Sequence, residues 1–330
     1  MSHDGQRRPS LAVVVPIHDE AGSIAELVGR LLPVLRDLSV SPAVILVDDG
    51  STDGTAAVLA QLHAAHPDVV TVLRLSRNFG QQAALTAGMD WADADAVVCM
   101  DGDGQHPPEL IPELVARWQE GFDVVQAVRR PAADAGLVKR WTSAGFYALL
   151  NLLSSTHVEP SGADFRLVSR RVADVFRTQI RERDRFLRGL VAWVGYPSCR
   201  VEFDARARLS GFTKYSLRRM LSLARSGFVS FSKVPLKFAV VIGMLVSLAS
   251  FLYGIFAIVA FFRFGHVLPG WASTIVVVTF LGGCNLLFLG LIGEYLGTIF
   301  DETKARPLYL VTDVLGPPAR PPAAPARPSA

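Results

Sequence analysis

Apolar positions follow two different periods along the first part of this chain. Short apolar runs rich in β-branched residues have the length of buried strands, and we expect strands at 11–16, 43–47, 70–75, 96–100 and, further on, 124–128. The segments between the first four runs space their apolar side chains as helices do, at 24–35, 55–65 and 82–92. Strands alternating with helices of this length predict an α/β domain with a mainly parallel sheet covered on both faces.

Two longer apolar stretches follow, at 238–262 and 271–293, and neither contains a charged residue. Each is long enough to cross a hydrocarbon core of about 30 Å at roughly 1.5 Å per residue. Buried helices of a soluble core are the alternative, but uncharged runs of this length are rare there. We therefore predict two transmembrane helices joined by a short loop.

Charge predicts which side of the membrane the chain occupies. Lys233 and Lys237 precede the first span, and Lys304 and Arg306 follow the second. The positive-inside rule then places both flanks in the cytoplasm, with Arg263 in the outer loop as a minor conflict. Because residues 1–10 are polar and do not form a signal peptide, we expect the N-terminal domain to be cytoplasmic as well.

A basic segment lies just before the first span. No Asp or Glu occurs between residues 205 and 293, whereas Lys and Arg recur from 206 to 237. Helical spacing of apolar residues within 215–232 predicts an amphipathic helix in the membrane interface. For Arg218, Arg219 and Arg225, a functional role and simple attraction to anionic head groups are equally good explanations.

Polar clusters follow each of the first four predicted strands, at 16–20, 48–54, 76–80 and 101–105. Each cluster alone can be a turn or a helix cap, as Asp53-Gly54 illustrates. Because the carboxyl ends of parallel strands meet at one edge of a sheet, the four together predict a single ligand site.

The side chains in these clusters suit a nucleotide and a metal ion. Carboxylates can accept hydrogen bonds from a base and a ribose, and Asp103 with Gln105 offers oxygen ligands to Mg²⁺ or Mn²⁺ beside a diphosphate. The sequence has neither a Gly-x-x-x-x-Gly-Lys loop nor a Gly-x-Gly-x-x-Gly turn after the first strand. A Walker-type ATPase and a dinucleotide cofactor are therefore disfavoured.

Several motifs together make the chain resemble a known family. They lie at 15–20, 47–55, 77–80, 101–109, 162–167, 185–193, 211–215, 293–297 and 306–309. In these segments the chain resembles family 2 glycosyltransferases of GT-A fold, in particular the bacterial two-span polyisoprenyl-phosphate glycosyltransferases and the dolichol-phosphate-mannose-synthase-like group. Such enzymes usually have Asn at the position of Asp19, and Ala and Leu at those of Gly102 and Gly104.

The resemblance implies roles for individual residues. It assigns nucleotide-sugar binding to Pro16, Asp19, Glu20, Asp48, Asp49, Ser51, Arg77 and Asp101. It assigns the metal to Asp103 and Gln105, and the reacting centre to Asp103, Asp164, Arg206 and Lys214. Binding of the lipid phosphate is assigned to Arg129, Arg166, Arg206 and Lys214. For Asp164, simple pairing with Arg166 is the alternative, and for Arg129 a solvated loop is.

The implied reaction is transfer of a hexose from a nucleotide diphosphate sugar to polyprenyl phosphate at the cytoplasmic face of the plasma membrane. A lipid phosphate is already anionic, so it can attack the sugar without a strong base, and one in-line displacement inverts the anomeric centre. Glucose is the expected sugar, and mannose from GDP-mannose is the alternative. A processive polysaccharide synthase is disfavoured by the two spans and the missing Gln-x-x-Arg-Trp signature, and a non-catalytic nucleotide-sugar-binding scaffold by the intact carboxylates.

The expected organisation is a flexible N-terminus at 1–10, a catalytic domain at 11–204, a basic interfacial segment at 205–236 and a transmembrane hairpin at 237–300. A cytoplasmic segment with a disordered Pro/Ala-rich tail follows at 301–330. The predicted helix of the second span carries five small residues of the type that allows close helix packing, Gly282, Gly283, Gly290, Gly293 and Gly297, so we also expect a homo-oligomer.

Overall fold

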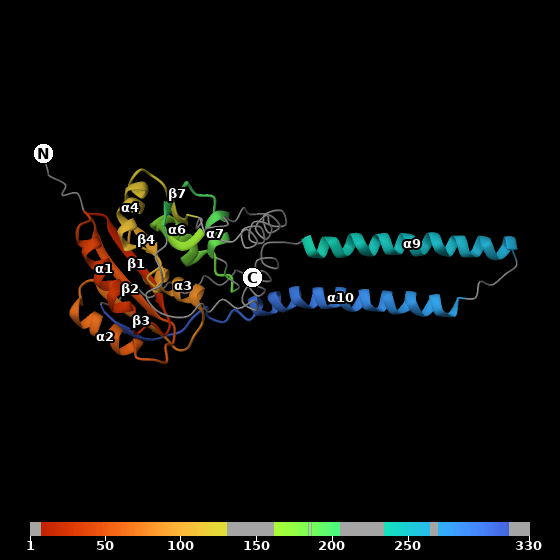
Figure 1. Ribbon diagram of the computed structural model, residues 1–330, viewed down its shortest axis with the longest axis horizontal. Helices are drawn as coiled ribbons and strands as arrows, with labels where there is room; N and C mark the ends of the chain where they lie inside the picture. Colours follow the sequence, from red (N-terminus) through yellow and green to blue (C-terminus); the bar gives the residue numbers. More distant parts are fainter. Residues whose placement is uncertain are drawn as a thin grey trace. The chain divides into compact units, whose positions relative to one another are not determined.

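The computed structural model describes residues 8–130, 162–183, 185, 187–204, 234–264 and 270–316 (Figure 1). These residues belong to two compact units, an α/β domain that includes the stretch from Pro307 onward and a pair of long helices. The predicted amphipathic helix at 215–232, with Arg206 and Lys214, lies outside the described residues, as does the tail from 317 onward.

The α/β domain is built on one sheet with the strand order β7-β5-β6-β4-β1-β2-β3-β8. The pairs β1–β2, β1–β4, β2–β3 and β5–β7 are parallel, while β6 and β8 run antiparallel to their neighbours. The strands are β1 (Ser10–Ile17), β2 (Ser41–Asp48), β3 (Val70–Leu75), β4 (Ala96–Cys99), β5 (Val124–Arg129), β6 (Gly162–Ser169), β7 (Ser198–Phe203) and β8 (Val311–Leu315).

Helices cover both faces of this sheet. On one face α1 (Ile24–Arg36), α2 (Thr55–Ala65) and α4 (Ile111–Gln119) share a core with Leu11, Val13 and Val15 of β1. Because side chains alternate along a strand, Val14 points to the other face. There α3 (Gln81–Trp91) approaches so closely that a Cβ at Gly88 would collide with Val14. Helix α6 (Arg170–Thr178) contacts α3 and β6.

The structure confirms the predicted α/β fold with a mainly parallel sheet, and each predicted strand and helix of the α/β domain is present within one or two residues of its expected ends. The sequence analysis did not predict β8. This strand lies after the long helices in the sequence, yet it pairs with β3 at the edge of the sheet.

The second unit consists of α9 (Val234–Phe264) and α10 (Trp271–Thr303). Both helices are long and apolar enough to cross a membrane, and their most apolar windows are not buried within the protein. An apolar helix surface left open to this extent suits lipid rather than water. Helix α10 continues beyond the predicted end of the second span at residue 293, as far as Thr303.

Candidate active site

Strand order creates a natural binding place at one edge of the sheet. From β1 the chain proceeds to β2 and β3 on one side, and then returns to place β4 on the other side of β1. Ligands of open α/β sheets bind outside the carboxyl ends of the strands at such a reversal. The predicted polar clusters at 16–20, 48–54, 76–80 and 101–105 follow the ends of these four strands.

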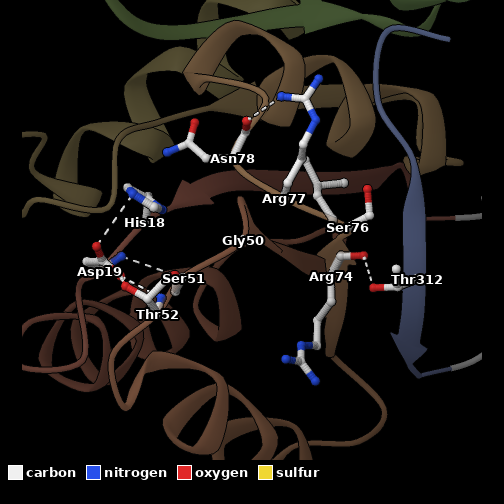
Figure 2. A pocket seen from close by; sticks show the side chains of 11 residues that line it. His18, Asp19, Gly50, Ser51, Thr52, Arg74, Ser76, Arg77, Asn78 and Thr312 are labelled. Atoms are coloured by element: carbon white, nitrogen blue, oxygen red, sulfur yellow. Dashed lines mark hydrogen bonds and ion pairs between the residues drawn. The ribbon is translucent and has the colours of Figure 1, made fainter.

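A cavity of about 560 Å³ opens at the ends of β1, β2 and β3 (Figure 2). Its lining is mostly polar and comes from the loops after these strands, from the end of β3 and from β8. The lining residues are His18, Asp19, Gly50, Ser51, Thr52, Arg74, Leu75, Ser76, Arg77, Asn78 and Thr312. Figure 2 shows His18, Asp19, Ser51 and Thr52 grouped on one side of Gly50, and Arg74, Ser76 and Thr312 on the other.

The loops after β1 and β2 are bonded to each other. The Asp19 amide donates to Ser51 Oγ at 3.1 Å, and the Thr52 amide donates to Asp19 Oδ1 at 2.8 Å. The second bond holds the pKa of the Asp19 carboxyl below its usual value. Asp19 has a positive φ of 55°, a conformation that Asn and Asp tolerate better than most residues. This backbone conformation is therefore compatible with either Asp or Asn at position 19.

Asp48 and Asp49 are both buried and serve the protein's own backbone. Asp48 accepts the Ser51 amide at 2.9 Å, and its other oxygen lies 3.6 Å from Arg74 Nε. Asp49 accepts the amides of Phe79 and Gly80 at 2.7 and 2.9 Å. Burial raises the pKa of Asp49 and outweighs these two bonds. Asp48 and Asp49 were both predicted to contact the nucleotide, but neither is among the described residues that line the cavity.

Gly50 brings the loops after β2 and β3 together. It has a φ of 65°, and a Cβ at this position would collide with the backbone of Arg77 and Asn78. Only glycine combines this conformation with this approach.

Substituting Gly50→Ala is therefore expected to lower the free energy of unfolding by about 3 kcal/mol and to distort the cavity. Chemical denaturation of the detergent-solubilised protein measures the change. Gly29→Ala is the matched control, because Gly29 lies in α1 and a Cβ added there would meet no neighbouring atom within 4 Å. An alanine there should stabilise by up to about 1 kcal/mol. Equal stabilities for the two variants would contradict the proposed close approach.

A second polar cluster follows β4. Asp103 Oδ1 accepts the Gln105 amide at 3.0 Å, which closes a tight turn, and Gly104 has a φ of 76° within it. The Asp101 amide donates to His106 Nδ1 at 2.9 Å. His106 is buried against the rings of Phe165 and Phe203, and burial lowers its pKa to about 4. The imidazole is thus neutral and keeps a lone pair for the Asp101 amide.

The two glycines of this turn have separate structural reasons. Gly104 adopts a left-handed conformation that a leucine would disfavour. Gly102 is buried against the first strand, and a Cβ there would lie 3.1 Å from the Pro16 carbonyl oxygen. A side chain at position 102 would therefore crowd β1, and one at position 104 would strain the turn.

Asp164 of β6 is held by two arginines. Arg188 Nε and Nη2 donate to its two oxygens at 3.0 Å each, and Arg166 Nη2 donates to Oδ1 at 2.7 Å. Although burial alone would raise the pKa of Asp164, Arg188 and Arg166 together lower it. The carboxylate therefore stays ionised at neutral pH, and with two guanidinium groups beside it the cluster carries a net positive charge.

The start of α3 joins the two carboxylate clusters. Gln81 Nε2 donates to Asp101 Oδ1, and Gln82 Nε2 lies 3.5 Å from Asp164 Oδ2. The backbone just before these glutamines is the part held by Asp49. Asp49 thus holds in place the segment whose glutamine side chains contact the Asp101 and Asp164 carboxylates.

The Asp101–Asp103 turn has the electrostatics of a cation site. Burial and the charges of Asp164 and Asp103 raise the pKa of Asp101 to about 7, so the carboxylates of this site repel one another. Among the described residues, no group of three or more His, Cys, Asp or Glu side chains is arranged to hold a metal. Mg²⁺ is commonly held by one or two carboxylates and completed by substrate phosphates, and the Asp103–Gln105 turn fits that mode.

The other predicted site residues lie in different surroundings. Pro16 is in β1, and the Glu20 side chain accepts Ser23 Oγ at the start of α1. The Arg77 guanidinium lies over the Phe79 ring at the rim of the cavity. Arg129 is exposed at the end of β5, whereas Arg166 is buried.

Arg188 lies in the 185–193 motif, for which the sequence predicted no role, and the sequence analysis did not identify Gln81, Gln82 or His106 as site residues. The signal for Arg188 was its place in the 185–193 motif, and that for His106 its position beside Asp101–Gln105.

Comparison with known proteins identifies the family. Residues 12–176 match the family model described as glycosyl transferase family 2. Over 93% of this chain, it is 42% identical to an uncharacterized glycosyltransferase, sll0501, of Synechocystis sp., of which 96% is covered. The chain belongs to glycosyltransferase family 2.

Two relatives carry more particular names. The bactoprenol glucosyl transferase of Shigella phage SfX is 38% identical over 91% of this chain and 98% of its own length. The prophage bactoprenol glucosyl transferase homolog of Escherichia coli K12 is 36% identical over 92% and 99%. Among solved structures, glucosyl-3-phosphoglycerate synthase from Mycobacterium tuberculosis, in complex with Mn²⁺, UDP and phosphoglyceric acid, is 18% identical with a TM-score of 0.46, covering 67% of this chain and 76% of that one.

Proposed function

We propose that this glycosyltransferase moves glucose from a nucleotide diphosphate sugar to polyprenyl phosphate. The observation that carries the proposal is the likeness to bactoprenol glucosyl transferases, which extends over 91% of this chain and 98% of the phage SfX relative. The similar region includes both the α/β domain and the two long apolar helices. It therefore combines a glycosyltransferase domain with helices that could anchor it at the membrane, beside a lipid acceptor.

The donor nucleoside is assigned to the cavity at the ends of β1, β2 and β3. Its hydroxyl, amide and guanidinium groups, such as Ser51, Asn78 and Arg74, match the polar edges of a base and a ribose. The diphosphate then extends toward the Asp101–Asp103 turn on the other side of β1. In this arrangement Asp49 acts indirectly, by holding the start of α3.

Asp103 and Gln105 are the residues proposed to hold Mg²⁺ or Mn²⁺, with Asp101 beside them. A divalent cation there would offset the repulsion among the carboxylates and neutralise the departing nucleoside diphosphate. Asp101 is held by Gln81 and by the backbone contact to His106, so the turn presents its oxygens in a fixed direction.

The acceptor phosphate is assigned to the positively charged side of the site. Arg188 is the better candidate from β6 and its surroundings, because 31% of its side chain is exposed against 4% for Arg166. Arg129, Arg206 and Lys214 remain proposed ligands for the same phosphate. Asp164 is proposed to orient Arg188 rather than to act as a general base, since the two arginines lower the pKa of this carboxyl, which makes it a weaker base, and occupy both of its oxygens.

Catalysis then depends on placing two anions in line. The lipid phosphate attacks the anomeric carbon, the bond to the nucleoside diphosphate breaks, and an α-linked donor gives a β-linked product. The α/β domain is proposed to work at the cytoplasmic face, and cysteine accessibility at the α9–α10 loop in intact cells would test that topology. Self-association through the glycines of α10 is also proposed, because open space surrounds Gly290 and Gly293 in this chain.

The decisive experiment measures transfer by the purified full-length protein in detergent with polyprenyl phosphate and Mg²⁺ or Mn²⁺. Radiolabel from UDP-glucose should appear in the organic-extractable lipid, whereas GDP-mannose should give little product. Efficient labelling from GDP-mannose alone would overturn the choice of sugar. Nucleotide binding without transfer to any lipid phosphate would favour a non-catalytic scaffold.

A further inference from the structure

One side of the nucleotide cavity is made by a segment that follows the membrane helices in the sequence. Thr312 of β8 lines the cavity, and its hydroxyl donates to the Arg74 carbonyl oxygen at 3.2 Å. The Ser76 amide donates to the Leu310 carbonyl oxygen at 2.9 Å. Arg74 and Ser76 also line the cavity, so the segment holds two of its other lining residues (Figure 2).

A buried polar cluster holds this segment to α3. The Tyr309 hydroxyl donates to Asp90 Oδ2 at 2.8 Å, and Arg181 Nη1 donates to both oxygens of Asp90 at 2.9 and 2.8 Å. Tyr309 is 9% exposed and Asp90 4% exposed. Burial and the neighbouring Asp90 carboxylate raise the pKa of Tyr309, so its hydroxyl keeps the proton that it donates.

The strand itself is a weak attachment. β8 has five residues, lies at the edge of the sheet, and its register with β3 shifts between Arg74 and Leu75. Its exposed positions bury little apolar surface, so the strand gains little from packing. The buried Tyr309–Asp90–Arg181 contact supplies a fixed point directly before β8.

We infer that Tyr309 is a positioning residue of the nucleotide site, which docks the segment 307–312 so that Thr312 and the bonded end of β3 complete the cavity. The inference rests on the proposed function, because it assigns the cavity to the donor nucleotide. If docking improves nucleotide binding, a bound nucleotide must strengthen docking by the same factor. Both directions are measurable.

The experiment uses the full-length protein in detergent, with UDP and GDP as probes for calorimetry and for hydrogen exchange of peptides spanning 307–316. Tyr309→Phe removes only the hydroxyl and should weaken binding of the preferred nucleotide about fivefold, while Tyr309→Ala should weaken it at least about tenfold. In the wild type the nucleotide should slow exchange in 307–316, and both variants should reduce that protection. The KM for the sugar donor should rise in parallel, with the KM for the lipid unchanged.

Tyr196→Phe is the matched control, since it makes the same chemical change at a tyrosine that contacts Arg171 through its ring. It should bind nucleotide as the wild type does. If the wild type binds nucleotide and both Tyr309 variants match it in affinity and exchange, the inference is overturned while the proposed function stands. If the wild type binds neither UDP nor GDP, both are overturned.

Discussion

Replacing Asp103 with alanine is expected to lower kcat/KM for glucosyl transfer by at least about a hundredfold. A metal that neutralises a leaving diphosphate contributes several kcal/mol to the transition state, and each 1.4 kcal/mol is about a factor of ten in rate. Asp103 lies between two glycines in the turn after β4, and its repulsion with Asp101 marks the place where positive charge is lacking. Transfer of label to lipid, measured over a range of Mg²⁺ and Mn²⁺ concentrations, checks the prediction.

A second variant separates charge from turn geometry. Asp103→Asn keeps an oxygen that can accept the Gln105 amide but loses the negative charge. It should retain the fold and need a higher metal concentration, whereas chelation by EDTA should stop the wild type. Asp68→Ala is the control for removing a carboxylate, because Asp68 is exposed before β3, far along the strands from the site. Full activity of Asp103→Ala would refute the metal assignment.

Much of the fold could be predicted because burial leaves a direct record in the sequence. The runs that became β1, β2 and β4 are buried along most of their length, so nearly every position is apolar. β8 leaves no such record: it is a short edge strand with a mixed burial pattern, and its partner β3 lies more than two hundred residues earlier. Its pairing depends on the folded sheet rather than on local composition.

The location of the site could be predicted from the sequence, but the roles of its individual residues could not. Strand ends gather the carboxylates at one edge for topological reasons, which the alternation of strands and helices already contains. Whether Asp49 faces a ligand or a backbone amide depends on how the loop before α3 closes over it. Likewise, Arg188 reaches Asp164 only because α7 (Leu187–Trp193) begins beside β6, a tertiary contact with no sequence period.

The Asp164–Arg188 ion pair carries the second large expected effect. Arg188→Ala removes the partly exposed cation and leaves Asp164 with Arg166, so the cluster loses its net positive charge. We expect kcat to fall at least about a hundredfold, because the acceptor phosphate loses a group that places it in line. Arg188→Lys keeps a positive charge without the two-pronged contact and should lie between the alanine variant and the wild type. An Arg188→Ala variant whose kcat equals that of the wild type would contradict this role.

Asp164→Asn distinguishes a positioning carboxylate from a general base. A general base would give a pH–rate profile with an acidic limb that this variant removes, whereas a positioning residue predicts the same profile at a lower plateau. The variant also leaves two guanidinium groups facing a neutral amide, so it should lose about 3 kcal/mol of stability. Arg170→Ala is the matched surface control, because the Arg170–Asp93 pair is as short as the Arg166–Asp164 pair, 2.7 Å, but exposed. This variant should lose less than about 1 kcal/mol of stability and no activity. Because the pKa of Asp164 is lowered in the folded protein, this contribution to stability should be complete at neutral pH and should be lost as the pH falls through that lowered folded-state pKa.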